Sequence, residues 1–420
     1  MVTRRPGPRV CLVTLNYAPE VSGIGPYTAS LAHGLAQRGF RVRIVAAAPH
    51  YPMWRVADRG TWSPEERDHG VEVRRITSYV PRRPRMLNRA LFEILYGLRF
   101  ASRSYDDDVV VLVSPGMLAS AVMRLRLPRR IPVVLWVQDV YSAGVTEVGG
   151  RGGVAARLIA QVEGWLMRRC DRVVVIHERF TEQLAALFSL QSDTIRVIRN
   201  WAQVDNATRA EPVDLRARFG WPADATLVVH AGTMGVKQDL GNVVATARLA
   251  ESTGAPIRFI LIGQGSQRAD LEELARGCHT IGFIDPLPEA RLVPTLRTAD
   301  LLLVNEAPGV VQTALPSKLT TYFSSGRPVI AATESDSVTA TEVTASGAGV
   351  VVAPGDPEAL IMAVQQLAAA DTAHLQRAGA SYVSSMLEPD ASLDDWAETL
   401  ASLTEEQVTM AVHTGKGSER

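Results

Sequence analysis

Short apolar runs alternate with amphipathic segments along most of the chain. A fully apolar run predicts a strand buried on both faces, and helical patterns between such runs indicate a parallel sheet covered by helices on both sides. A helix is predicted over 27–39, between the first two strands. The strands predicted in the first half are RVCLVTL (9–15), RVRIVAA (41–47), VEVRRI (71–76), DVVVLV (108–113), PVVLWV (132–137) and RVVVI (172–176).

The same rhythm restarts in the second half. Its predicted strands are TLVVHAG (226–232), IRFILIG (257–263), HTIGF (279–283), DLLLVN (300–305), PVIAA (328–332) and GVVV (349–352), with helices over 240–252, 267–276, 287–298 and 317–325. Two such series predict an α/β protein with two doubly wound, Rossmann-like domains. The polar, proline-closed stretch 200–212 separates them, which gives domains over 1–203 and 204–385, a final helix over 386–408 and a polar tail over 409–420.

Charge is balanced overall but divided between the halves. Residues 1–200 hold 29 Lys and Arg against 17 Asp and Glu, a net charge of +12, so the remaining residues carry −12. A basic half favours an anionic surface or acceptor, although mutual attraction of the two halves explains the division as well. The arginines of PRRPRMLNR (81–89), followed by a helical pattern over 91–100, predict either a surface helix on anionic lipid or a merely solvated helix.

Composition excludes several classes of protein. No apolar run approaches the ~20 residues that span a bilayer. Three scattered cysteines show no metal-ligand spacing and favour a reducing compartment, so we expect a cytoplasmic protein without a metal site, at most peripheral at the inner membrane face. The basic residues are dispersed and lack interleaved aromatic residues, which disfavours nucleic acid as a partner.

Loops that follow a strand and precede a helix are the candidate ligand sites, because ligands bind at the carboxyl ends of parallel strands. The first is NYAPEVSGIGPY (16–27), where Gly23 and Gly25 would let backbone N–H groups approach a diphosphate at a helix start. A third glycine at the dinucleotide-binding spacing is missing, so NAD is disfavoured.

Lysine is scarce, and its positions are informative. The chain has only three lysines: Lys237, Lys318 and Lys416. Lys318 lies in the predicted first turn of a helix that Ser317 would cap, where the helix dipole disfavours a cation unless an anion is bound there. Lys237 stands in a glycine-containing loop that begins at Gly232. A compact ammonium suits a phosphate, so these residues predict a diphosphate site; the alternative is two exposed surface lysines.

The motifs together resemble the retaining glycosyltransferases of family four, which have the GT-B fold, and in particular the colanic-acid, fucosyltransferase-like branch of exopolysaccharide assembly. The runs that carry the resemblance are YAPEVSGIGPYTASLAHGLAQRGFRVRIVAAAPHYP, WVQDVY, GTMGVKQDL, LIGQGSQRADLEEL and LPSKLTTYFSSGRPVIA. The resemblance implies a nucleotide diphosphate sugar held by the C-terminal domain and a glycan or polyprenyl-linked acceptor held by the N-terminal domain, with a cleft between them. It also implies retention, no metal or other cofactor, and a terminal helix that crosses back to the first domain.

Residue by residue, the chain departs from the family's pattern. The Arg and Lys that follow the first strand of the second domain fall on Thr233 and Gln238, with Lys237 adjacent to the latter. The family's paired glutamates fall on Thr313 and Thr321, which leaves Lys318 as the expected cation. The nucleotide and sugar are expected against Gly263, Gly265, Thr313, Pro316 and Thr321. The resemblance places the nucleotide base against Phe283, for which an ordinary core position is the alternative.

Acceptor residues are expected in the first domain. His50 and Tyr51 follow its second strand, and Gln138 and Asp139 follow PVVLW. Asp139 is the first candidate for orienting or polarising the acceptor hydroxyl, with His50 second; an Asp at a strand end is also a common helix cap. A sugar-nucleotide 2-epimerase and a non-catalytic sugar-nucleotide-binding partner remain as alternatives.

Overall fold

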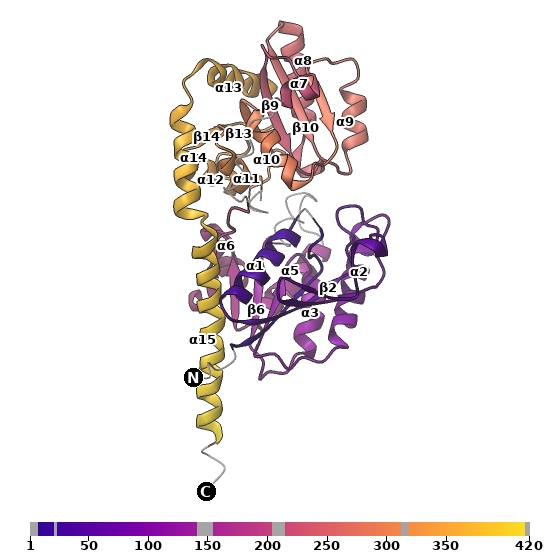
Figure 1. The fold of residues 1–420 in the computed structure, drawn as a ribbon, viewed down its shortest axis with the longest axis vertical. Helices are drawn as coiled ribbons and strands as arrows, with labels where there is room; N and C mark the ends of the chain where they lie inside the picture. Colours follow the sequence, from indigo (N-terminus) through magenta and orange to yellow (C-terminus); the bar gives the residue numbers. More distant parts are fainter. Residues whose placement is uncertain (1–6, 21–22, 141–153, 204–214, 312–317, 416–420) are drawn as a thin grey trace. The chain divides into compact units, whose positions relative to one another are not determined.

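The computed structural model describes residues 7–20, 23–140, 154–203, 215–311 and 318–415 (Figure 1). Chain contacts divide it into two compact units. The N-terminal unit comprises Met1–Thr146, Arg151–Asn200 and Pro389–Arg420, and the C-terminal unit comprises Glu147–Gly150 and Trp201–Glu388. Each unit contains one sheet and its helices.

An eight-stranded sheet forms the N-terminal unit, in the order β3-β4-β2-β1-β5-β6-β7-β8. The central strand β1 pairs in parallel with β2 and β5, so that Val10 lies beside Val42 and Val109. Only β3 runs antiparallel to its neighbour. The strands are β1 (Arg9–Thr14), β2 (Arg41–Ala47), β3 (Glu65–Asp68), β4 (Val71–Ile76), β5 (Val109–Val113), β6 (Val133–Val137), β7 (Arg172–Val175) and β8 (Ile195–Val197).

Helices flank this sheet, and the last helix of the chain packs against it. Trp396 of that helix is fully buried, with its ring 5.1 Å from the Trp136 ring of β6. Arg38 holds the same helix through Asp390 at 2.9 Å and Asp394 at 2.6 Å. The helices of this unit are α1 (Gly25–Gln37), α2 (Met86–Ala101), α3 (Met117–Arg126), α5 (Val154–Met167), α6 (Glu178–Phe188) and α15 (Pro389–Gly415).

The C-terminal unit contains a fully parallel six-stranded sheet in the order β11-β10-β9-β12-β13-β14. Its strands are β9 (Thr226–Ala231), β10 (Ile257–Ile262), β11 (Ile281–Ile284), β12 (Leu301–Asn305), β13 (Val329–Ala332) and β14 (Gly349–Val352). Its helices are α7 (Leu215–Phe219), α8 (Gly241–Thr253), α9 (Arg268–Leu274), α10 (Glu289–Thr298), α11 (Lys318–Ser325), α12 (Val338–Ser346), α13 (Pro357–Ala369) and α14 (Ala373–Met386).

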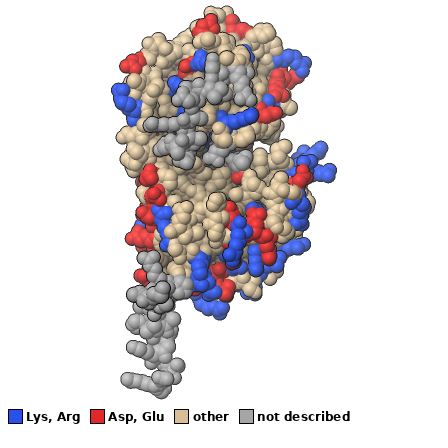
Figure 2. Space-filling model, in the orientation of Figure 1, with Lys and Arg blue, Asp and Glu red and all other residues tan. Residues whose placement is uncertain are grey.

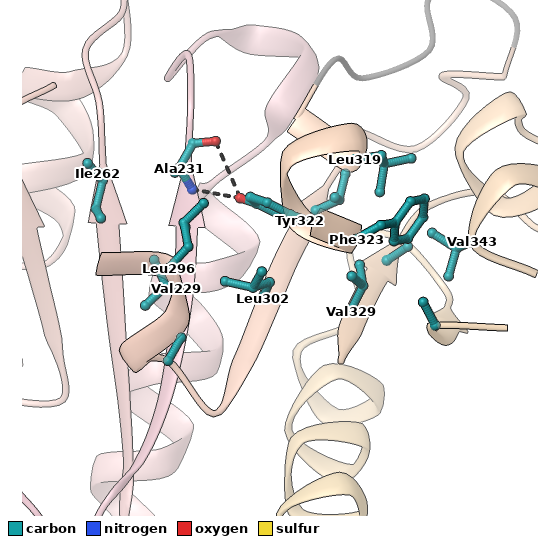
Figure 3. Packing of buried hydrophobic residues seen from close by; sticks show 14 of the residues in the cluster. Val229, Ala231, Ile262, Leu296, Leu302, Leu319, Tyr322, Phe323, Val329 and Val343 are labelled. Atoms are coloured by element: carbon teal, nitrogen blue, oxygen red, sulfur yellow. Dashed lines mark hydrogen bonds between the residues drawn. The ribbon is translucent and has the colours of Figure 1, made fainter. Parts of the chain in front are cut away.

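Helix α11 is fixed to the sheet by apolar packing and one buried hydroxyl. Figure 3 shows Leu319, Tyr322 and Phe323 of this helix packed among side chains of the sheet, in a single apolar cluster. The Tyr322 hydroxyl accepts a hydrogen bond from the Ala231 N–H at 2.8 Å, at the carboxyl end of β9. The first residue of α11 is thereby held near the end of that central strand.

The predicted α/β class with two Rossmann-like sheets is confirmed, and details of several elements differ. Strand β3 was not predicted, because its sequence, EERD, shows no alternation of apolar and polar residues. It lies at the edge of the sheet and pairs with β4 alone. The three-residue β8 was also missed. Helix α15 continues to Gly415, beyond the predicted end at 408. Among the described residues, no helix combines the length and the apolar character that crossing a membrane requires.

Candidate functional site

The loops that leave β9 and β10 approach each other too closely for a side chain at Gly263. Gly232 has a φ of +147°, and a Cβ on Gly263 would lie 1.9 Å from the Gly232 carbonyl oxygen. Only glycine avoids this clash, because it has no Cβ. The result is a rim made of backbone at the carboxyl end of the sheet, beside which Thr233 is exposed.

Lys318 reaches this rim from the start of α11. Its Nζ lies 3.2 Å from His230 Nε2, and a Cβ on Gly232 would lie 2.8 Å from the same ammonium. His230 is fully buried on β9, and its Nδ1 is 3.1 Å from the Leu303 carbonyl oxygen. Nδ1 therefore carries the ring proton, and Nε2 is left as an acceptor for the lysine ammonium.

Burial shifts the pKa values of both Lys318 and His230. Burial lowers the pKa of the Lys318 ammonium to about 8, and the Glu306 carboxylate opposes that shift. Burial, followed by the charge of Lys318, holds the pKa of His230 well below its usual value. At neutral pH the pair is thus a cationic lysine beside a neutral imidazole.

Glu306 is the acidic group of this region. It follows β12, is 8% exposed, and accepts a hydrogen bond from the Thr339 hydroxyl at 2.9 Å. The Thr333 hydroxyl donates to its other carboxylate oxygen. Two hydroxyl donors stabilise the charged carboxylate. The sequence analysis did not select this residue.

The loop with Lys237 forms the short 3-10 turn η3 (Val236–Gln238). The buried Asn305 holds it by donating to the carbonyl oxygens of Gln238 and Asp239, at 2.9 and 3.0 Å. The Gln238 side-chain oxygen accepts from the Gly235 N–H at 3.2 Å, so that oxygen stabilises the turn. The half-buried Lys237 forms no ion pair with any residue that the structure describes.

Phe283 was predicted to lie against the nucleotide base. The structure places it half-buried on β11, packed against the sheet core. The Arg268 guanidinium lies 5.2 Å from the centre of its ring and donates to the Gly263 carbonyl oxygen at 2.6 Å. Gly265 follows in the same loop, where a Cβ would meet the backbone of Met234. Arg268 therefore joins Phe283 to the glycine rim, a role that sequence reasoning missed.

Thr313, Pro316 and Ser317 lie outside the described residues. Thr321 is described: it is half-buried on α11, one turn after Lys318. Of the predicted donor residues, the structure thus brings Lys318, Gly232 and Gly263 into direct proximity.

In the N-terminal unit, Glu20 joins the loops that follow β1 and β2. It is 6% exposed, and its Oε1 accepts from the backbone N–H groups of His50 at 2.7 Å and Tyr51 at 2.8 Å. Its Oε2 accepts from the Asn16 side chain at 2.8 Å. The predicted Gly23 and Gly25 are in the same region: a Cβ on Gly23 would touch the Tyr51 ring, and one on Gly25 would touch Glu20.

His50 was predicted as the second candidate for activating an acceptor, but the structure gives it a packing position. It is 4% exposed, its Nδ1 lies 3.0 Å from the Ala48 carbonyl oxygen, and burial lowers its pKa. Its ring lies 5.0 Å from Phe92 and 5.9 Å from Trp54. The ring therefore packs among aromatic side chains, and these contacts hold the loop that follows β2.

The end of β6 carries the other two predicted acceptor residues. Gln138 and Asn200 form a buried amide pair, in which Asn200 Nδ2 donates to Gln138 Oε1 at 2.8 Å. Asp139 follows directly and is half-buried. Gln138 therefore belongs to a structural pair, and Asp139 stands next to it at the carboxyl end of the strand. Within the described parts of the chain, no group of three His, Cys, Asp or Glu residues is arranged to hold a metal ion.

Two protein-family models match this chain, one in each half. A family model described as "Glycosyl transferase 4-like domain" matches residues 22–201, and one described as "Glycosyl transferases group 1" matches residues 225–370. WcaI of Escherichia coli K12, named for glycosyl transfer in colanic acid biosynthesis, is 29% identical over 377 residues, which cover 85% of this chain and 91% of that relative.

Solved structures agree on the fold. A sucrose-phosphate synthase from Thermosynechococcus elongatus superposes with a TM-score of 0.72 at 17% identity, covering 95% of this chain and all of its own. HepE of Anabaena, solved with UDP-glucose, gives 0.69 at 15% identity, covering 93% of this chain and 99% of its own. The two family models and the shared fold identify the chain as a GT-B glycosyltransferase of the family-four type.

Proposed function

We propose that this chain transfers a hexosyl group from a nucleotide diphosphate sugar to a glycan or polyprenyl-linked acceptor, with retention and without a metal ion. The observation that carries the proposal is the Lys318 ammonium, held 3.2 Å from His230 Nε2 at the glycine rim of β9 and β10. Nucleotide ligands of doubly wound sheets occupy this edge. The UDP-glucose complex of HepE, a protein of the same fold, supports a donor of this class.

Lys318 would stabilise the diphosphate leaving group. When the bond between the anomeric carbon and the β-phosphate oxygen breaks, its electrons remain on the diphosphate, which gains negative charge. A fixed ammonium near that oxygen stabilises the charge as it develops. Lys237 would be a second cation on the same side, since η3 holds it in the adjacent loop.

On the acceptor side, Asp139 is the residue we assign to orient the attacking hydroxyl. It stands at the end of β6, whereas the ring of His50 is buried. The relative WcaI is named for colanic acid biosynthesis, which supports a role in cell-surface polysaccharide assembly. Retention follows from the family resemblance, and the expected route is departure and attack on one face of the sugar.

Calorimetric titration with UDP, GDP and dTDP tests the proposal. The nucleotide that binds best should bind Lys318→Ala more weakly by about 1.5–3 kcal/mol, the scale of a hydrogen bond to a charged group. Arg276→Ala is the control, because it removes an exposed cation of the same unit that pairs with Glu273. Equal affinity of the wild-type protein and Lys318→Ala would overturn the assigned donor site.

A further inference from the structure

Helix α2 exposes an apolar face. The side chains of Leu87, Leu91, Ile94 and Leu98 are 80, 47, 38 and 54% exposed. At about 100° per residue, these four positions fall within roughly 60° of the helix circumference. Figure 1 places α2 at the right-hand edge of the N-terminal unit. The four exposed side chains, called the α2 stripe below, are thus a continuous feature and not scattered surface residues.

The opposite face of the same helix is buried. Phe92, Tyr96 and Phe100 are at most 2% exposed. Gly97 lies against α3, where a Cβ would come within 2.9 Å of Ala119 Cα. This close packing fixes the rotation of α2 about its axis, so the α2 stripe must face outward.

Arginines flank the α2 stripe at both ends of the helix. Residues 79–104 contain six arginines and a single glutamate. Five of these arginines are exposed: Arg82, Arg83, Arg85, Arg99 and Arg103. The glutamate, Glu93, is buried and accepts from the Leu118 N–H at 2.9 Å. The outer surface of this segment therefore offers apolar and cationic groups but no exposed carboxylate, and Figure 2 shows many Lys and Arg side chains on the N-terminal unit.

The inner face of α2 contacts the loop on the proposed acceptor side. The Phe92 ring lies 5.0 Å from the His50 ring and 5.5 Å from the Trp54 ring. The Tyr96 hydroxyl accepts from the Ser78 N–H at 3.2 Å. One helix thus has the apolar stripe on its outer face and the acceptor-side loop on its inner face.

We propose that α2 docks on the surface of an anionic phospholipid bilayer. The α2 stripe would enter the boundary between headgroups and acyl chains, and the flanking arginines would contact lipid phosphates. Docking would hold the His50–Trp54 loop about 10 Å, one helix diameter, from the membrane surface, where a polyprenyl-linked acceptor resides. That last consequence rests on the proposed function, whereas the docking itself does not.

Charge selects lipid over a second copy of the chain. Two copies joined across the α2 stripe would bring their exposed arginines together, and like charges at an interface repel. Anionic headgroups neutralise the same arginines. An anionic lipid surface therefore accounts for both the α2 stripe and the exposed arginines that flank it.

Flotation with phosphatidylcholine vesicles, with and without phosphatidylglycerol, tests the docking of the full-length protein. Wild type should float with the anionic vesicles and much less with the neutral ones. Arg82→Gln/Arg83→Gln/Arg85→Gln should weaken binding about 100-fold, since each arginine near an anionic surface contributes about 1 kcal/mol. Leu87→Gln/Leu91→Gln/Leu98→Gln should weaken it at least ~10-fold.

A matched control is Leu187→Gln/Leu274→Gln/Met362→Gln, which alters side chains that are 54, 50 and 53% exposed on three other helices. It should float like wild type. All variants should keep the wild-type nucleotide affinity, which separates failure of docking from failure of the donor site. The proposal is overturned if wild type does not float, if the control loses binding equally, or if wild type is a dimer that the α2 leucine variant dissociates.

Discussion

At the scale of single residues, the proposed donor site depends on one ammonium whose pKa lies close to neutral pH. Burial lowers the pKa of Lys318 to about 8, so the ammonium begins to lose its proton just above neutral pH. A bound diphosphate favours the charged form, which means that binding takes up a proton above pH 8. Nucleotide affinity should therefore fall as the pH rises from 8 to 9.5.

Titration calorimetry at several pH values measures this dependence. Lys318→Arg is the control, because a guanidinium stays protonated throughout this range. Its affinity, whatever its absolute value, should change little with pH. A wild-type affinity that is flat between pH 7 and 9.5 would show that the titrating ammonium does not contact the nucleotide.

His230 should tune Lys318 without touching the substrate. Its Nε2 accepts a hydrogen bond from the Lys318 ammonium, and its Nδ1–H donates to the Leu303 carbonyl oxygen. His230→Leu removes an acceptor that favours the charged lysine, so the fall in nucleotide affinity should begin at lower pH than in wild type. An unchanged pH profile would assign His230 a packing role alone.

The sequence analysis selected residues of a type that is rare in this chain. It missed residues whose interaction partners lie far away in the sequence. Lys318 and Lys237 were selected as candidates because lysine is so scarce in this chain. His230 could not be found, because its partner Lys318 is 88 positions away. Glu306 was missed for the same reason: its partner Thr339 lies on α12, 33 positions away. Pairs of this kind exist only once the fold has formed.

At the scale of elements, the site depends on how α11 is anchored. The Tyr322 hydroxyl satisfies the Ala231 N–H at the end of β9 (Figure 3). Tyr322→Phe leaves that buried donor unpaired and should lower the free energy of unfolding of the C-terminal unit by about 1–3 kcal/mol. Nucleotide affinity should also fall, since the same helix carries Lys318.

Chemical denaturation followed by a probe in the C-terminal unit measures this loss. Tyr79→Phe removes the same hydroxyl from a side chain that is 41% exposed, and it should leave stability unchanged. If Tyr322→Phe were as stable as Tyr79→Phe, the hydrogen bond would not anchor the helix.

The sequence predicted those strands whose positions are all buried and therefore form an uninterrupted apolar run. The strands β5, β6 and β12 are buried at every position, and their apolar runs predicted them. The edge strand β3 alternates between exposed and half-buried polar residues, so it has no apolar pattern to detect. Loop conformation was less accessible, because the turn at Lys237 is held by Asn305, a side chain far from it in sequence.

At the scale of the whole molecule, the chain returns to its first unit at the end. Trp396 of α15 is fully buried against Trp136, so Trp396→Ala should cost the N-terminal unit about 3–5 kcal/mol. Hydrogen–deuterium exchange reads the two units separately. Exchange should accelerate in β6 and β7 and stay unchanged in β9 and β10. Equal acceleration in both units would contradict the assignment of α15 to the N-terminal unit.

The restart of the βα rhythm was sufficient to predict two Rossmann-like sheets from the sequence. Charge gave a second indication of the division, since the first 200 residues carry +12 and the remainder −12. Neither pattern could reveal the face of α2 that points outward. That orientation depends on the close packing of Gly97 against α3.

The central claim is that the diphosphate of a nucleotide sugar binds at the glycine rim beside Lys318. A crystal structure of the protein with the nucleoside diphosphate selected by calorimetry tests it most directly. We predict a phosphate oxygen at hydrogen-bonding distance, about 3 Å, from Lys318 Nζ. A diphosphate bound elsewhere, with this ammonium still donating only to His230, would contradict the account.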